Sequence, residues 1–226
     1  GTEIILVNKP SLPITPVGML LKTGGIDDPK HLAGLAKFST DMLIEGTTTR
    51  SSSQIAEEIE FMGSHLSKET SREHTILALS GLSDHLEKGL GLLADVVQNP
   101  SFPSSEYERL RNEKLADLST LGDNADLVAN ISSRSILYGA NSPYGHPVNG
   151  TAESIASIVN EEINKHYANH ISPCHRTFLV VGNTSMEDIV KLVERNFTRE
   201  KLLCMDMPPP PAGLNTAIPE ATEQAR

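Results

Sequence analysis

The chain has 226 residues, of which 38% are hydrophobic and 21% charged, a balance typical of one or two globular domains. Nineteen basic residues against 29 acidic ones give a net charge of −10, and the absence of a basic stripe argues against nucleic acid and anionic membranes as partners. No apolar run reaches the roughly 18 residues of a membrane-spanning helix, so we expect no membrane insertion. Neither a signal peptide nor a basic targeting segment opens the sequence, but this does not fix the compartment. The localisation stays unknown, and we expect a soluble protein of the bacterial cytoplasm or periplasm rather than of an organelle.

Strand and helix signals come in pairs along the first third of the chain. Residues 3–7 and 16–22 have the composition of strands. Apolar residues at three- and four-residue steps predict a helix over 31–45, closed by Gly46. The serines at 51–53 offer N-caps for a second helix, which Gly63 would end.

The middle of the chain predicts a hairpin followed by two helices. Residues 64–70 and 72–81 alternate as two antiparallel strands joined by a polar turn. Residues 84–98 form a strongly amphipathic pattern, and Ser104 and Ser105 are candidate caps of a helix over 106–121. The charges of this helix alternate in sign, which predicts a solvent-exposed, salt-bridged face for most of Glu106, Glu108, Arg109, Arg111, Glu113, Lys114 and Asp117.

The last third predicts helices over 127–139 and 185–197, two short helices within 153–170, and a buried strand over 175–182. Paired strands and successive helices favour an α+β fold with a largely antiparallel sheet packed by helices over an alternating βαβ arrangement. Residues 1–203 are expected to form this domain. Residues 204–226 contain four consecutive prolines and a polar tail, and we interpret them as a linker towards a second domain that is missing from this sequence.

The chain resembles the M16 family of zinc peptidases, of the insulinase or mitochondrial-processing-peptidase type. Residues 34–47, GLAKFSTDMLIEGT, match the family's first helix, G-L-A-H-F-x-E-H-M-L-F-x-G-T, at every position outside the zinc chemistry except Ile44. Residues 142–151, SPYGHPVNGT, are similar to its P-Y-G-x-P-x-x-G-T loop, and residues 175–183 to its late strand. The resemblance covers nearly the whole chain up to about residue 200 and implies an M16-type fold.

The resemblance also locates the positions of the family's zinc chemistry. In H-x-x-E-H two histidines bind zinc and the glutamate is the general base. These positions fall on Lys37, Thr40 and Asp41, and the family's third ligand, a glutamate, falls on Asp117. An ammonium has no lone pair and a threonine hydroxyl is no base near pH 7. We therefore assign no catalytic and no metal-binding role to these four residues.

Two interpretations of the altered positions stay open. Lys37 and Asp41 lie four residues apart on one helix face. The ammonium of Lys37 could stand in the place of the metal cation, paired with both Asp41 and Asp117. Alternatively, the residues form an ordinary solvated polar face.

Other residues are candidates for metal binding or substrate binding, but each also has a structural explanation. His166 and His170 have metal-ligand spacing, with Cys174 or His175 as a third ligand, but we favour the simpler explanation that histidine suits the C-terminal end of a helix. The resemblance implies that His74, on a strand, and Tyr144, in the turn-rich loop, lie near a peptide substrate. The alternatives are a surface or core histidine and a loop that only shapes the backbone.

The resemblance implies a non-catalytic M16 domain, the inactive half or subunit of a zinc metalloendopeptidase. An active half would supply the zinc, this chain would form the wall of the peptide chamber without a cofactor of its own, and a dimer is one form of such an assembly. A structural or assembly subunit, similar to the peptidase-derived core proteins of respiratory complexes, is the alternative. A metalloenzyme using His166 and His170, or the two aspartates, is a second one.

Overall fold

The computed structural model describes residues 2–11, 13–139, 141–171 and 176–197. The expected linker at 204–226 and the end of the domain at residue 203 lie outside these ranges, as do Cys174 and His175. Within them, no helix has the length and apolar character that a membrane-spanning segment requires.

All five predicted strands form, and they build one sheet in the order β1-β5-β2-β4-β3. The pairs β5–β2, β2–β4 and β4–β3 are antiparallel, while β1 runs parallel to β5. The predicted largely antiparallel sheet is therefore confirmed. The strands are β1 (Glu3–Asn8), β2 (Val17–Leu21), β3 (His65–Thr70), β4 (Thr75–Ser80) and β5 (Arg176–Gly182).

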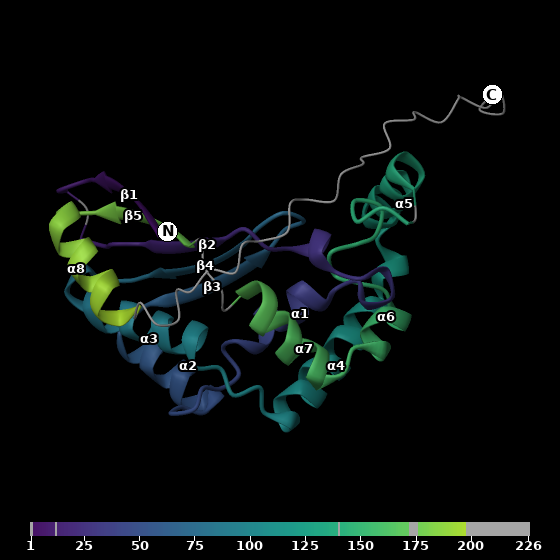
Figure 1. Cartoon of the computed structure of the whole chain (residues 1–226), viewed down its shortest axis with the longest axis horizontal. Helices are drawn as coiled ribbons and strands as arrows, with labels where there is room; N and C mark the ends of the chain where they lie inside the picture. Colours follow the sequence, from purple (N-terminus) through teal and green to yellow (C-terminus); the bar gives the residue numbers. More distant parts are fainter. Residues whose placement is uncertain (1, 12, 140, 172–175, 198–226) are drawn as a thin grey trace.

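The helices lie on one side of this sheet and leave its other face without a helix in the described part of the chain (Figure 1). They are α1 (Leu35–Met42), α2 (Ser52–Phe61), α3 (Leu86–Gln98), α4 (Ser104–Ser119), α5 (Ala125–Tyr138), α6 (Ala152–Ser157), α7 (Asn160–His166) and α8 (Met186–Asn196). A π-helical turn, η5 (Tyr167–Ile171), follows α7 directly. Helix α5 stands at the end of the molecule, away from the sheet (Figure 1).

One hydrophobic core joins the helices to the sheet. Alternate residues of a strand point to the same face, so Val17, Met19 and Leu21 of β2 all turn towards the helices and are buried. Phe38 and Met42 of α1 are fully buried in the same cluster. The α+β fold predicted from the paired strands and successive helices is thus confirmed, with α1 packed at the centre.

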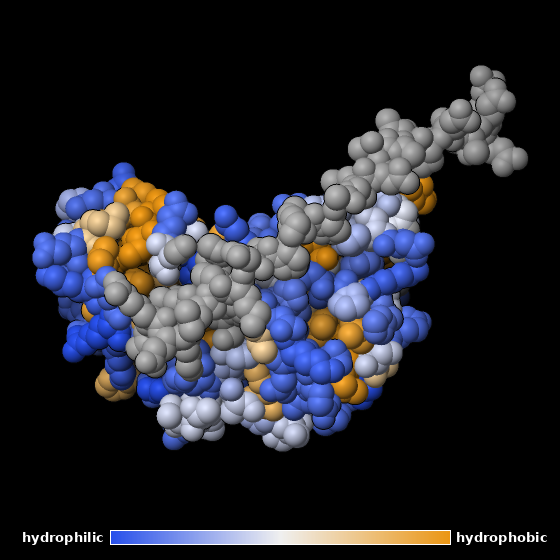
Figure 2. All heavy atoms as spheres, viewed as in Figure 1, coloured by the Kyte–Doolittle hydropathy of each residue, from blue (hydrophilic) through white to orange (hydrophobic). Residues whose placement is uncertain are grey.

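The opposite face of the sheet exposes apolar side chains at the β1–β5 end. Ile5 and Leu179 are paired across the two strands, and Val7 follows on the same face. All three are exposed. We call these three residues the β1–β5 patch; Figure 2 shows apolar side chains gathered at this end of the molecule.

Two predicted helix boundaries are wrong. The helix expected over 31–45 begins at Leu35, because Gly34 has a left-handed backbone (φ 95°) that interrupts the helix. Ser104 and Ser105 do not cap α4: the N-cap is Pro103, and no side chain bonds to the free amides there. The cap predicted at Ser51 is confirmed, since its hydroxyl accepts a hydrogen bond from the Gln54 amide.

Candidate functional site: a lysine cluster around Asp41

Asp28 fixes the start of α1, the helix that carries the altered zinc-motif positions. Its two carboxylate oxygens accept hydrogen bonds from the amides of Gly34 (2.9 Å) and Ala36 (2.8 Å). These are amides that the first helical turn leaves free. Burial raises the pKa of Asp28 to about 7, although the backbone hydrogen bonds act to lower it. Asp28 was not predicted from the sequence, because this residue caps the helix from six residues upstream of Gly34.

Thr40 and Asp41 are buried, so the interpretation of these positions as a solvated face is wrong for both. The hydroxyl of Thr40 donates a hydrogen bond to the carbonyl oxygen of Ala36, 2.9 Å away, within the helix. One turn of α1 brings Lys37 and Asp41 to the same face, towards β3 and α4, where Asp41 meets lysines from both elements.

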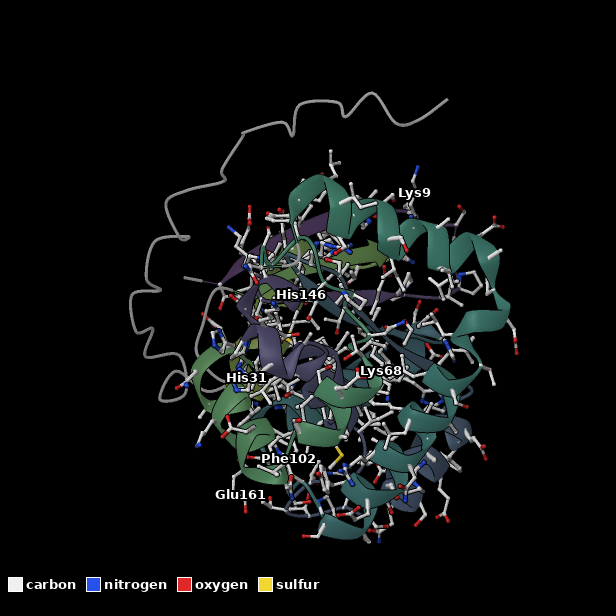
Figure 3. The ribbon with its side chains drawn as sticks, turned by 90° about the vertical axis from the view of Figure 1, so that its right-hand side faces the viewer. Lys9, His31, Lys68, Phe102, His146 and Glu161 are labelled. Carbon is white, nitrogen blue, oxygen red and sulfur yellow. The ribbon has the colours of Figure 1, made fainter. Side chains whose placement is uncertain are left out.

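Three lysines surround the carboxylate of Asp41. The ammonium of Lys37 lies 3.4 Å from Oδ2, and that of Lys68, on β3, lies 3.4 Å from Oδ1. Lys114, on α4, donates a hydrogen bond to Oδ2. Lys68 also donates to the backbone oxygen of Asp41 at 3.2 Å, and Figure 3 shows it near the middle of the molecule. We call these four residues the Asp41 cluster.

The charges within the Asp41 cluster set its protonation. Burial acts to raise the pKa of Asp41, but the ammonium groups of Lys114, Lys68 and Lys37 together outweigh it, and the pKa is lowered. Burial lowers the pKa of Lys114, and the positive charges of Lys37 and Lys68 add to this effect against the attraction of Asp41. The ammonium of Lys114 also lies 5.2 Å from the ring centroid of Phe38, a cation–π distance.

Of the two ion pairs predicted for Lys37, with Asp41 and with Asp117, the structure contains only the first in its described part. Lys37 pairs with Asp41, but in the described part of the chain no ion pair joins Lys37 to Asp117. Lys114 takes the position between α1 and α4, and its ammonium, on a side chain that is 15% exposed, reaches Asp41 from about one turn before Asp117. The prediction of Lys114 on an exposed face is therefore wrong. Arg109 of the same helix does form the predicted salt bridges, with Glu106 and Glu113.

A pocket of about 290 Å³ opens beside the cluster. Lys37, Lys114 and Asp117 form its charged wall. We call it the α1–α4 pocket; its remaining lining residues are Leu118, Thr120, Leu121, Asn124, Leu127 and Asn149.

The side chains at the four aligned positions do not fit a zinc ion. Zinc needs ligand atoms with free lone pairs, from histidine, cysteinate or carboxylate. Lys37 offers an ammonium, the Thr40 hydroxyl is bound within α1, and the Asp41 carboxylate is engaged by three lysines. Asp117 alone is left, and one carboxylate is not a zinc site.

Tyr144 and His74 come from two segments that touch each other. The Tyr144 hydroxyl donates a hydrogen bond to the carboxylate of Glu73, the neighbour of His74 in the turn between β3 and β4. The Nδ1 atom of His74 lies 2.9 Å from the hydroxyl oxygen of Ser71 in the same turn. The turn-rich loop is therefore anchored to the β3–β4 hairpin.

His166 and His170 stack on each other rather than facing a common point. Their ring centroids are 4.9 Å apart with 26° between the planes, so their in-plane lone pairs do not converge. His166 is 4% exposed, and within the described residues neither ring nitrogen has a hydrogen-bond partner. Burial and the neighbouring His170 lower its pKa to about 3. In the ranges that the structure describes, no three potential ligands gather at one point.

The sheet, the helices on one of its faces and the motif frame of α1 together describe a peptidase-type domain. Residues 3–145 match the model of the insulinase family, peptidase family M16. The chain belongs to this family.

Relatives and solved structures agree with this assignment. The chain is 30% identical over 199 residues to an uncharacterised zinc protease of Rickettsia bellii, and 28% identical over 201 residues to one of Rickettsia felis. These alignments cover 88% and 89% of this chain but 48% of each relative, so the chain spans about half their length. The crystal structure of a peptidase M16 inactive domain from Pseudomonas fluorescens matches 89% of this chain and 48% of its own, with 25% identity and a TM-score of 0.82.

Proposed function

We propose that this chain is a non-catalytic M16 domain, the inactive half or subunit of a zinc metalloendopeptidase. The observation that carries the proposal is the Asp41 cluster: the positions aligned with zinc ligands are occupied by lysine and by an aspartate that three lysines already hold. The likeness to an M16 inactive domain of Pseudomonas fluorescens supports it.

In this role the chain binds the active half and the peptide but does not catalyse the hydrolysis. The family resemblance implies two halves that close around a peptide, with zinc in the active half. The β1–β5 patch is an exposed apolar surface of the kind that contacts a partner, as are Ile136 and Leu137 of α5. Tyr144 and His74 are the residues proposed to face the peptide.

The test is reconstitution with an active half. The purified chain is assayed for zinc content and peptide hydrolysis, alone and co-expressed with each M16 protein of its genome that carries H-x-x-E-H. We expect far less than one zinc per chain and no hydrolysis alone. Hydrolysis should appear with one partner and vanish when the glutamate of that partner's motif is changed to glutamine.

Two outcomes would contradict the proposal. Chelator-sensitive hydrolysis by the chain alone would make it an enzyme in its own right. A stable complex with a partner that lacks the zinc motif, and that hydrolyses no peptide, would favour the structural or assembly role.

Substrate contact is tested in the reconstituted peptidase. Tyr144→Ala and His74→Ala should raise KM and leave kcat nearly unchanged, because residues that bind the substrate equally in ground and transition states affect KM alone. Tyr138→Ala, whose ring lies 5.7 Å from that of Tyr144, is the matched control for loss of packing.

A further inference from the structure

The Asp41 cluster holds more positive than negative charge. Three ammonium groups contact one carboxylate, and in the described ranges Lys37, Lys68 and Lys114 form no salt bridge with any other acid. Two positive charges are therefore unpaired, at a place where the side chain of Lys114 is only 15% exposed. Ionised groups removed from water are stable only when paired, so the cluster favours the arrival of an anion.

The α1–α4 pocket gives an anion access to two of these lysines. Lys37 and Lys114 both line it, and Lys37, whose side chain is 32% exposed, has one long contact with an acid among the described residues, 3.4 Å to Asp41. An ammonium has three N–H donors. Lys37 thus retains donors for a ligand oxygen.

The rest of the pocket wall suits a small apolar group. Leu118, Leu121 and Leu127 line it together with the amides of Asn124 and Asn149. The volume of about 290 Å³ is large enough for one amino-acid residue with its carboxylate.

Asp117 limits how strongly the pocket attracts an anion. It shares the wall with Lys37 and Lys114, and its carboxylate has no salt bridge in the described ranges. Counting Asp117, three ammonium groups face two carboxylates, and one positive charge remains. Removing the negative charge at residue 117 should therefore strengthen the binding of an anion, which is a test of the proposed charge balance.

We propose that the α1–α4 pocket binds a carboxylate of a peptide, held by Lys37 and Lys114, with the adjoining apolar side chain against the leucines. The C-terminal carboxylate and an acidic side chain share this chemistry. The inference rests on the proposed function only in taking the ligand to be a peptide.

The test measures binding of short peptides to the 226-residue chain by calorimetry. The probes are acetyl-Ala-Ala-Leu with a free C-terminus, the same peptide as its amide, and the amide of acetyl-Ala-Glu-Ala. We expect the free acid to bind about tenfold more tightly than its amide, since charge-assisted hydrogen bonds are the strong ones. Its affinity should fall as salt screens the lysines. Comparable binding of the glutamate peptide would identify an acidic side chain as a second source.

Matched variants distinguish binding in the pocket from a general effect of the protein's net charge. Lys37→Met should weaken binding of the free acid about tenfold, and Asp117→Asn should strengthen it. Lys9→Met makes the same charge change at an exposed site, which Figure 3 shows at the edge of the molecule, and should have no effect. Circular dichroism of each variant shows whether it is folded.

Equal affinity for acid and amide would overturn the inference, as would equal effects of Lys37→Met and Lys9→Met. The two proposals fail separately. A chain that supports hydrolysis with its partner but does not bind the free acid refutes only the carboxylate site. A chain that binds the acid through Lys37, yet never supports hydrolysis, refutes only the peptidase role.

Discussion

Asp41 is the residue on which three elements converge. It is one carboxylate on α1, facing a lysine of β3 and a lysine of α4 as well as Lys37 of its own helix. Isolated surface pairs contribute little to stability. Removing the common partner of several partly buried charges has a much larger effect, because the lysines left behind repel each other without compensation.

Asp41→Ala should therefore lower the free energy of unfolding by about 2 to 3 kcal/mol, below the range for a fully buried pair because the lysines are partly exposed. Asp117→Ala is the control, and we expect it to change the free energy of unfolding by less than about 0.5 kcal/mol. Urea denaturation at pH 7 measures both. Equal effects of the two substitutions would mean that the cluster does not stabilise the fold.

Asp28 should make the stability of the protein depend on pH. The unfolded carboxyl loses its proton near pH 4, whereas the folded one keeps it to about pH 7. Between these values the folded state binds more protons, so the contribution of Asp28 to the free energy of unfolding falls as pH rises, by about 2.6 kcal/mol between pH 5 and pH 8. Asp28→Asn should lose this contribution, so the free energy of unfolding of the wild type minus that of the variant should fall by that amount from pH 5 to pH 8, as urea denaturation at the two pH values would reveal. A difference that is the same at both pH values would assign the titration to another group.

At the scale of elements, the predictions that succeeded were those that depend on local sequence pattern, such as the spacing of apolar residues. Strand β2 was predicted from its composition. The hairpin of β3 and β4 was predicted because a short polar turn separates two strand-like runs, the second of which has alternating apolar residues. The start of α1 was missed because it depends on a left-handed Gly34 and on the distant Asp28. The local sequence pattern indicates which face of an element is apolar. It does not indicate which distant residue caps the end of a helix.

Helix α7 carries a histidine that should sensitise the fold to acid. The folded pKa of His166 is about 3, and the ordinary value is near 6.5. Between these values the unfolded chain binds more protons, so the contribution of His166 to the free energy of unfolding falls as pH falls, by about 2 kcal/mol from pH 7 to pH 5.

His166→Leu should lose this contribution at little loss of stability at pH 7, because within the described residues neither ring nitrogen has a hydrogen bond to lose. The free energy of unfolding of the variant should therefore rise relative to that of the wild type as pH falls from 7 to 5, whereas His170→Leu, one turn on in η5, should follow the wild type. Urea denaturation at the two pH values distinguishes the variants, and a constant difference between His166→Leu and wild type would contradict the assignment.

For the whole molecule the two titrations oppose each other. From about pH 4 to pH 6.5, Asp28 destabilises the fold as pH rises, and His166 destabilises it as pH falls. The wild-type chain should therefore have a nearly flat stability across this window. Asp28→Asn should become more stable with rising pH and His166→Leu less stable. Slopes of the same sign in both variants would refute the compensation.

The sequence by itself determined the strands, most of the helices and the family, because these rest on periodicity and on an ordered set of local motifs. It also located Lys37, Thr40, Asp41 and Asp117. Only the tertiary structure decided what these residues do. Lys68 and Lys114 reach Asp41 from 27 and 73 residues away. Alternating charges on α4 predicted an exposed face, yet packing of α4 beside α1 turned Lys114 inward. The pairing of charges depends on distances between elements, which a sequence pattern within one element does not encode.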